Sequence, residues 1–208
     1  MFFPKMTLYH YWRSSCSWRV RWALAVKGLS YESVAINLLE GEQREELYLK
    51  KNLSGFVPCL QIGDEFVSES FAILEWLEES CPNPALIPKD SMARLRMREF
   101  CLKIVSGIQP IQNLAVMRFH SQEKEKQKKW SKHWIEKGLF ACENLVSNRG
   151  ENFCFGENLS FADLCLVPQV YNAKRFDVSM ELFPKLNKLY EKALRTETCQ
   201  EAHPDKFS

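Results

Sequence analysis

The sequence predicts an α/β domain followed by an all-helical domain, and three observations support this division. Strand-like and helix-like patterns alternate over roughly the first eighty residues. Prolines then interrupt the chain at positions 81–84 (Cys-Pro-Asn-Pro) and 87–88 (Ile-Pro). Beyond them the patterns are helical, with no convincing strand. Because such prolines make a stiff, extended connection, we assign residues 1–83 to the α/β domain, 84–90 to a linker and 91–208 to the helical domain.

The α/β domain is expected to have the element order β-α-β-α-β-β-α. The expected strands are residues 7–11, 31–37, 58–62 and 65–68, of which the last two form a hairpin across Gly63 and Asp64. The expected helices are 15–27, ended by Gly28, and 69–80, with a short helix or irregular segment at 41–53 between them. This order is typical of one small mixed sheet with helices packed on it.

The second domain is expected to be helical throughout. Helical patterns cover 91–119, with a kink near Gly107 and Pro110, and then 122–147, 160–173 and 183–196. Ser160 and Asp163 have the spacing of a capping box, in which two side chains satisfy backbone N–H groups of the first helical turn. We expect loss of this pair to reduce stability or folding rather than to affect chemistry.

The composition is ordinary for a soluble globular protein: 208 residues, of which 46% are hydrophobic and 26% charged. A net charge of +2 gives no reason to expect nucleic acid or an anionic membrane as a partner. The eight cysteines include no C-x-x-C pair and no zinc-ligand spacing, and we find no signal peptide or membrane span. We therefore expect reduced thiols in a cytoplasmic protein without a metal site.

One motif lies where the first expected strand is followed by the first expected helix. The segment 12–21, Trp-Arg-Ser-Ser-Cys-Ser-Trp-Arg-Val-Arg, places Ser14, Ser15 and Cys16 at that helix N-terminus. The first turn of a helix has N–H groups without internal partners and a partial positive charge, so it favours an anion. Beside serines, a cysteine and flanking arginines, that anion could be a thiolate, a phosphate or a carboxylate.

Two further segments narrow the choice of ligand. A small α/β domain with a reactive loop before its first helix suggests a thioredoxin-like architecture, in which the residue before a cis-proline binds an extended peptide. The pair Val57-Pro58 has that position. Glu69 and Ser70 open the next helix, where Ser70 could bind a carboxylate and Glu69 an ammonium group. Glutathione, with its thiol, peptide backbone, carboxylates and amine, fits all three places.

Several segments together resemble the zeta-class glutathione transferases, the maleylacetoacetate isomerases. These segments are 14–24 (Ser-Ser-Cys-Ser-Trp-Arg-Val-Arg-Trp-Ala-Leu), 57–58, 69–73 with 77–79, 107–110 with 112–114, and 161–170. The resemblance spans nearly the whole chain and implies a thioredoxin-like domain followed by a helical-bundle domain, the glutathione transferase fold. The chain departs from the family pattern at Glu69, where glutamine is common, at Leu53, where proline is common, and at Trp22, where isoleucine is usual. None of these changes removes a group that the chemistry needs.

The resemblance also implies a set of site residues. Ser14 would hydrogen-bond the glutathione sulfur, and Ser15 and Cys16 complete the expected catalytic group. The expected glutathione-binding residues are Ser14, Ser15, Cys16, Ser17, Trp18, Arg19, Gln43, Val57, Pro58, Glu69, Ser70, Gln109 and Asn113. Four of these residues could instead have structural roles. Ser15 and Ser17 could cap the helix, Trp18 could belong to the core, and Gln109 could be a buried packing residue. Cys16 could position the substrate, form a mixed disulfide with glutathione or tune the pocket.

The implied reaction is the glutathione-dependent cis–trans isomerisation of maleylacetoacetate to fumarylacetoacetate in phenylalanine and tyrosine breakdown, with glutathione regenerated as a cofactor. Arg13 and Arg175 are candidates to bind this small dicarboxylate substrate, with an ion pair as the alternative for either. Gln109 and Asn113, four residues apart on one expected helix face, would face the ligand. The family implies a two-fold homodimer, with 69–76 and 92–100 as candidate contact surfaces.

Two other functions stay open at this point. One is a general glutathione transferase that acts on small electrophiles such as α-halo acids, because the same thiolate serves both reactions. The other is a non-catalytic binding module. The intact Ser-Ser-Cys loop argues against the module, since a scaffold needs no hydroxyl that stabilises an anion.

Overall fold

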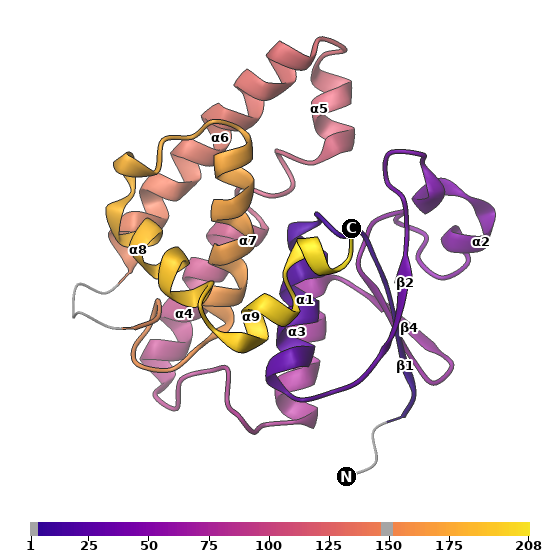
Figure 1. Ribbon diagram of the computed structural model, residues 1–208, viewed down its shortest axis with the longest axis horizontal. Coiled ribbons are helices and arrows are strands. Elements are labelled where there is room, and N and C mark those ends of the chain that lie inside the picture. Colours follow the sequence, from indigo (N-terminus) through magenta and orange to yellow (C-terminus); the bar gives the residue numbers. More distant parts are fainter. Residues whose placement is uncertain (1–3, 147–151) are drawn as a thin grey trace. The chain divides into compact units, whose positions relative to one another are not determined.

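A computed structural model describes residues 4–146 and 152–208 of the chain (Figure 1). The chain divides into two compact units. The first unit contains the residues up to 84 together with 197–208, and the second unit contains residues 85–196. The expected helical domain, 91–208, therefore extends too far: its last residues, 197–208, belong to the first unit.

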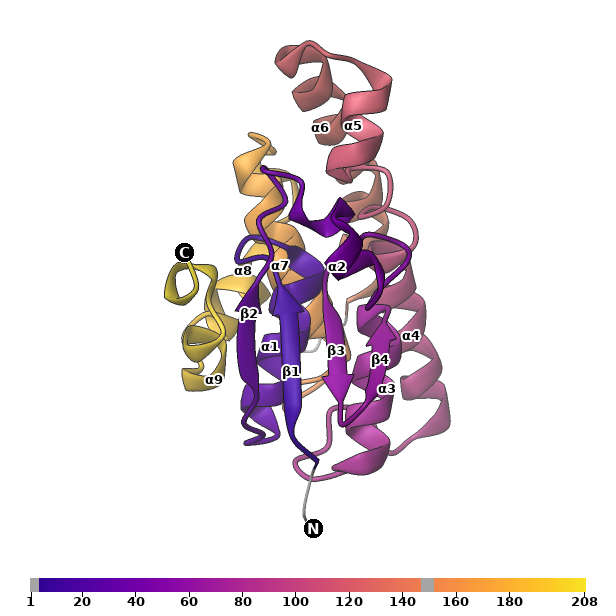
Figure 2. The same ribbon diagram turned by 90° about the vertical axis from the view of Figure 1, so that its right-hand side faces the viewer.

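The first unit contains a four-stranded mixed sheet in the order β2-β1-β3-β4 (Figure 2). Its strands are β1 (Met6–His10), β2 (Glu32–Ala35), β3 (Cys59–Ile62) and β4 (Glu65–Ser68). β2 pairs with β1 in parallel, whereas β3 is antiparallel to both β1 and β4. The small mixed sheet and its β3–β4 hairpin are confirmed.

Helices lie on both sides of this sheet (Figure 1). α1 (Ser15–Val26) and α3 (Ser70–Ser80) cover one face, and α2 (Glu46–Leu49), which follows a 3-10 turn (Glu42–Arg44), lies on the other. Side chains alternate between the two faces along each strand. Leu8 and Leu60 are paired and buried towards α1 and α3, whereas the neighbouring Cys59 packs with Tyr48 of α2 in a second small core.

The C-terminal segment, residues 197–208, packs on α1 of the first unit. It consists of α9 (Glu197–Glu201) and a 3-10 turn (Pro204–Lys206). Trp22 Nε1 donates to Thr198 Oγ1 at 3.1 Å, and Arg21 Nε donates to Ala202 O at 3.2 Å. The sequence boundary missed this association because a helical pattern shows that a helix forms, not what it packs against.

The second unit is helical, as predicted. Its helices are α4 (Ser91–Val105), α5 (Leu114–His120), α6 (Lys124–Leu145), α7 (Phe161–Arg175) and α8 (Pro184–Ala193), with a 3-10 turn (Met180–Leu182) before α8. α7 is buried on almost every side and packs against α4, α6 and α8. A helix that is apolar all round is typical of the centre of a bundle.

The expected single helix over 91–119 is wrong. α4 ends at Val105, and a series of turns over 106–113 separates it from α5. Pro110 has no N–H group to continue a helical ladder. A Cβ atom on Gly107 would lie only 2.6 Å from Lys103 O, so this turn requires glycine. The two residues therefore break the helix instead of kinking it.

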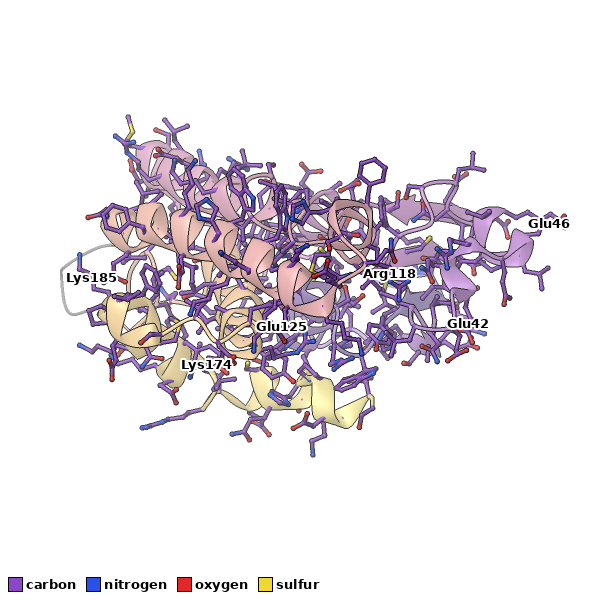
Figure 3. All side chains as sticks on the ribbon, turned by 90° about the horizontal axis from the view of Figure 1, so that it is seen from above. Glu42, Glu46, Arg118, Glu125, Lys174 and Lys185 are labelled. Atoms are coloured by element: carbon purple, nitrogen blue, oxygen red, sulfur yellow. The ribbon has the colours of Figure 1, made fainter. Side chains whose placement is uncertain are left out.

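Two carboxylates cap helices of the second unit. Asp163 accepts hydrogen bonds from Ser160 N (2.9 Å), Ser160 Oγ (2.9 Å) and Cys154 N (2.8 Å) at the start of α7, which confirms the predicted capping box. Glu143 of α6 accepts from the N–H groups of Lys185 and Leu186, both at 3.0 Å, at the start of α8, where Figure 3 labels Lys185.

Among the described residues, 4–146 and 152–208, we find no helix that combines the length and the hydropathy needed to span a bilayer. The same residues contain no group of three or more His, Cys, Asp or Glu side chains that could hold a metal ion. All eight cysteines lie in this part of the chain as free thiols, and only Cys16 and Cys81 are partly exposed.

Candidate functional site

The register of the sheet brings four predicted segments to one end of it. Tyr9 of β1 pairs with Cys59 of β3, and Cys59 pairs with Ser68 of β4. The end of β1, the start of β3 and the end of β4 therefore lie side by side, and β2 ends there too (Figure 2). The segments that leave the sheet at this end carry Ser14, Gln43, Val57 and Glu69.

Ser14 is the N-cap residue of α1. Its N–H donates to Tyr11 O at 3.0 Å, and its Oγ accepts from Ser17 N at 3.2 Å. Because the oxygen is the acceptor in this cap, the hydroxyl proton can be donated elsewhere. Ser14 is partly exposed, so an anion at the helix N-terminus can accept that proton in a hydrogen bond.

The next three residues complete the first turn of α1. Ser15 and Cys16 are partly exposed, as Ser14 is, whereas Ser17 is fully buried. Ser17 Oγ accepts from Tyr11 N at 3.4 Å, so the side chain connects the helix to the loop before it. The first turn of α1 is thus accessible at Ser14, Ser15 and Cys16. The buried Ser17 links this turn to the preceding loop through its hydrogen bond with Tyr11.

Arg19 connects α1 to the N-terminus of α3. Its side chain is buried, and Nη1 donates to Ser70 Oγ at 2.6 Å. A guanidinium group only donates, so the Ser70 oxygen is the acceptor and its hydroxyl proton points elsewhere. Ser70 is the first residue of α3 and therefore presents this hydroxyl where the helix favours an anion.

Glu69, the N-cap residue of α3, has an unusual backbone. Its φ of 71° lies in the left-handed region that favours glycine. The side chain is exposed, so its carboxylate is accessible at this end of the sheet. A strained backbone of this kind persists where the surrounding structure holds it, which is common at ligand-binding positions.

The predicted cis bond between Val57 and Pro58 is confirmed. Gln43 lies in the 3-10 turn beside Glu42, whose carboxylate accepts from Asn37 N at 2.6 Å (Figure 3 labels Glu42). Gln43 Oε1 is buried and has no hydrogen-bond partner among the described residues. A buried acceptor without a partner is destabilising, so Gln43 is a candidate to bind an N–H group of a ligand.

Trp18 and Arg13 are held by other aromatic residues. Trp18 is buried, and its ring meets that of His203 edge to face, with 5.0 Å between centroids. The Arg13 guanidinium lies over the Trp12 ring, 4.6 Å from its centroid, and Nη2 donates to the Tyr11 hydroxyl at 3.4 Å. Trp18 thus occupies the core, whereas Arg13 lies against residues of its own loop.

Gln109 and Asn113 lie in the second unit, within the turns between α4 and α5. The expectation that they share a helix face is wrong because α4 ends at Val105. Gln109 is buried, as its alternative interpretation expected. Asn113 is the N-cap residue of α5, and its Oδ1 accepts from Ala115 N at 2.9 Å.

Arg175 is the last residue of α7, also in the second unit. Its side chain is exposed, and Nη1 donates to Asn172 Oδ1 at 2.9 Å. An exposed guanidinium at this position is chemically able to bind a carboxylate in a bidentate manner.

Arg21 and His10 also contribute to this end of the sheet, although neither was among the predicted site residues. Arg21 is 1% exposed and donates to Tyr11 O (3.5 Å) and Trp12 O (2.9 Å), the carbonyls of the loop before Ser14. His10 Nδ1 lies 3.1 Å from Arg21 Nη1. The available signal was the presence of two arginines in an otherwise apolar helix segment without a nearby acidic residue.

The first unit therefore has two helix N-termini that each present a serine hydroxyl, together with an accessible carboxylate at Glu69 and a buried amide oxygen at Gln43. Such a surface can bind a ligand with anionic groups at two points and a positively charged group between or beside them. The donor and acceptor types fit glutathione, which has a thiol, two carboxylates and an amine.

Comparison with known proteins agrees with this architecture. Residues 4–79 match the family described as Glutathione S-transferase, N-terminal domain. Residues 109–200 match Glutathione S-transferase, C-terminal domain. The fold is thus that of a glutathione transferase.

Individual relatives place the chain within one class. Maleylacetoacetate isomerase of Mus musculus is 43% identical over 96% of this chain and 93% of its own length. Glutathione S-transferase Z1 of Arabidopsis thaliana is 42% identical over 97% of this chain and 93% of its own. The structure of maleylacetoacetate isomerase from Anaeromyxobacter dehalogenans with bound GSH is 41% identical, covers 98% of both chains and has a TM-score of 0.85. The chain belongs to the zeta-class glutathione transferase and maleylacetoacetate isomerase family.

Proposed function

We propose that this chain catalyses the glutathione-dependent cis–trans isomerisation of maleylacetoacetate to fumarylacetoacetate. The observation that carries the proposal is the Ser14 hydroxyl, which caps α1 through its oxygen and keeps its proton for an anion. Relatives named maleylacetoacetate isomerase, at 40% to 43% identity over nearly the whole chain, support it.

Ser14 stabilises a thiolate at the N-terminus of α1. A free thiol has a pKa near roughly 8.5, so only a few per cent of it is ionised at neutral pH. Lowering that pKa by about two units requires about 2.7 kcal/mol of preferential anion stabilisation. A hydroxyl donor and the helix N-terminus supply this together.

The remaining residues of the first unit hold the rest of the cofactor. Ser70, fixed by Arg19, binds a glutathione carboxylate, and Glu69 binds its ammonium group. Gln43 Oε1 accepts an N–H group, and the backbone of Val57 pairs with the peptide. When bound, glutathione supplies a thiolate that adds reversibly to the cis double bond, allows rotation about it and is then released unchanged.

The substrate carries two carboxylates, and we assign Arg13 and Arg175 to them. Arg13 is fixed over Trp12 beside the Ser14 loop, and Arg175 is exposed at the end of α7. Guanidinium groups suit carboxylates because they donate two parallel hydrogen bonds. We retain Gln109 and Asn113, polar residues near the start of α5, as residues that would contact glutathione.

The test is an isomerase assay with maleylacetone, a substrate surrogate, in the presence and absence of glutathione. We expect loss of the cis substrate only with glutathione, and a rate at least about tenfold lower for Ser14→Ala, equal to about 1.4 kcal/mol of transition-state stabilisation. Conjugation of an α-halo acid without isomerisation would instead indicate a general transferase. Failure to bind immobilised glutathione would indicate a non-catalytic module.

The quaternary state and the location of the protein are two further parts of the proposal. We infer a two-fold homodimer in the cytoplasm. Met92 and Leu95 on α4 are each 57% exposed, which is consistent with an apolar contact between subunits. Eight free thiols are consistent with a reducing compartment. Light scattering after size-exclusion chromatography and cell fractionation test the two statements separately.

A further inference from the structure

Arg21 is a buried guanidinium whose acceptors come from two distant parts of the chain. On one side it donates to Tyr11 O and Trp12 O, just before Ser14. On the other side its Nε donates to Ala202 O of the C-terminal segment at 3.2 Å. The Arg21 guanidinium is therefore hydrogen-bonded to backbone carbonyl oxygens and not to a carboxylate. Through these bonds Arg21 connects the loop before Ser14 to the C-terminal segment.

Phe207, in the C-terminal segment, packs against both Arg21 and His10. The Arg21 guanidinium lies over the Phe207 ring, with Cζ 4.5 Å from the ring centroid. The His10 ring meets the same ring edge to face, with 5.3 Å between centroids. Phe207 thus contacts both Arg21 and the last residue of β1, which directly precedes the Ser14 loop.

His10 fixes the orientation of Arg21. Because Arg21 only donates, His10 Nδ1 must accept its hydrogen bond, so the ring proton lies on Nε2 and is donated to Ser33 Oγ at 2.7 Å. Burial, and then the charge of Arg21, lower the pKa of His10 to about 3. Burial also lowers the pKa of Arg21, to about 10, and raises that of the nearby Tyr31. At neutral pH, Arg21 is charged while His10 and Tyr31 are neutral.

The loop that Arg21 holds is the loop that places Ser14. Ser14 N donates to Tyr11 O, the same carbonyl that accepts from Arg21 Nη1. A change in the position of Tyr11 or Trp12 would therefore move the N-cap of α1. Two further contacts attach the C-terminal segment to α1. Trp22 hydrogen-bonds Thr198, and the Trp18 ring contacts that of His203.

We propose that the C-terminal segment, residues 197–208, positions the Ser14 loop through Arg21 and Phe207. Arg21 is then a positioning residue for the thiolate site, although it contacts neither cofactor nor substrate. The inference rests on the proposed function, because its consequence is a change in the thiol of bound glutathione. Residues 197–208, although distant from Ser14 in sequence, would then influence the pKa of the glutathione thiol bound beside Ser14.

The test compares Phe207→Ala with Phe207→Tyr and with Ile73→Val. Phe207 is only half-buried, so its truncation leaves the core of the first unit intact. Phe207→Tyr keeps the ring and should behave as the unchanged protein does. Ile73→Val removes a buried methyl group from α3, a helix that carries neither Arg21 nor Phe207, and controls for general loss of stability.

Two readouts are used. The first is hydrogen exchange of a peptide covering residues 11–14 in the protein without glutathione, which should be about tenfold faster in Phe207→Ala than in either control variant. The second is the pKa of the bound glutathione thiol, followed by thiolate absorbance, which should rise by about 0.5 to 1 unit in Phe207→Ala alone.

The outcomes separate this inference from the proposed function. If the unchanged protein lowers the thiol pKa and Ser14→Ala raises it, but Phe207→Ala changes neither readout, the positioning role is wrong and the proposed function stands. If Ile73→Val produces the same changes as Phe207→Ala, the effect is general destabilisation and the positioning role is again overturned. An ordinary thiol pKa in the unchanged protein contradicts both.

Discussion

Arg19 Nη1 donates to Ser70 Oγ across 2.6 Å, inside the first unit. The bond joins α1, which begins beside Ser14, to the N-terminus of α3. One buried charge thereby orients the hydroxyl that is proposed to bind a glutathione carboxylate. Ser14 and Ser70 thus have separate duties, which mutation can distinguish.

Substitution of Ser70 should affect binding rather than thiol ionisation. We expect Ser70→Ala to raise the KM for glutathione about tenfold, or about 1.4 kcal/mol, because one charge-assisted hydrogen bond is lost. The pKa of the bound thiol should change little, and Ser70→Thr, which keeps the hydroxyl, should retain most of the affinity. Steady-state kinetics at varied glutathione concentration measure this. An unchanged KM in Ser70→Ala would remove Ser70 from the binding site.

The buried pair of Lys27 and Glu78 should be important for stability and unimportant for chemistry. Lys27 Nζ lies 2.6 Å from Glu78 Oε2 and donates to Pro84 O at 2.7 Å. Glu78→Gln leaves a buried ammonium group poorly compensated and should cost about 3–5 kcal/mol of unfolding free energy. The double variant Lys27→Met, Glu78→Leu should recover most of that loss. Urea unfolding measures both, and a Glu78→Gln loss below about 1 kcal/mol would contradict the assignment.

His10 should make the first unit sensitive to acid. Its pKa is lowered from 6.5 to about 3 in the folded chain, so between these values the unfolded chain binds a proton that the folded chain does not. The free energy of unfolding should therefore fall as the pH falls below about 6.5, by up to about 1.4 kcal/mol per pH unit from this residue.

His10→Gln, which keeps an acceptor for Arg21, should flatten that acid slope. Urea unfolding at a series of pH values between roughly 7 and 4.5 measures it. The same series on His120→Gln, at an exposed histidine of the second unit, controls for the substitution itself. Identical slopes in His10→Gln and the unchanged protein would show that His10 does not titrate in this way.

Gly138 of α6 is a point of close approach to the turns that carry Gln109. A Cβ atom there would lie 2.2 Å from Ile108 Cγ1 and 2.4 Å from Cδ1. Alanine favours a helix over glycine by about 1 kcal/mol, but overpacking of this kind costs about 1–3 kcal/mol. We expect Gly138→Ala to destabilise the protein and Ile108→Ala to relieve the clash in the double variant. Stabilisation by Gly138→Ala alone would contradict this packing.

Local patterns predicted most of the first unit. The four strands, α1 and α3 each depend on residues that are close in sequence, whereas the cis bond before Pro58 was expected from its position in a thioredoxin-like architecture and the Ser14 cap was seen only in the structure. The capping box of Ser160 and Asp163 was predicted for the same reason, since its partners are three residues apart.

Long-range contacts were not predictable in this way. Arg19 and Arg21 are two residues apart on a helix, and only the fold shows that both are buried and that their partners are Ser70 and Ala202. Patterns of hydrophobicity also did not reveal that 197–208 packs on α1. The break after Val105 was mistaken for a kink because proline and glycine signals are the same for both.

The most direct measurement is the pKa of the glutathione thiol bound to the unchanged protein and to Ser14→Ala. We expect a thiol pKa about two units below that of free glutathione in the unchanged protein, and a return to within about half a unit of roughly 8.5 in Ser14→Ala. Equal thiol pKa values in the two proteins, with glutathione bound to both, would contradict the assignment of the N-cap hydroxyl to the thiolate.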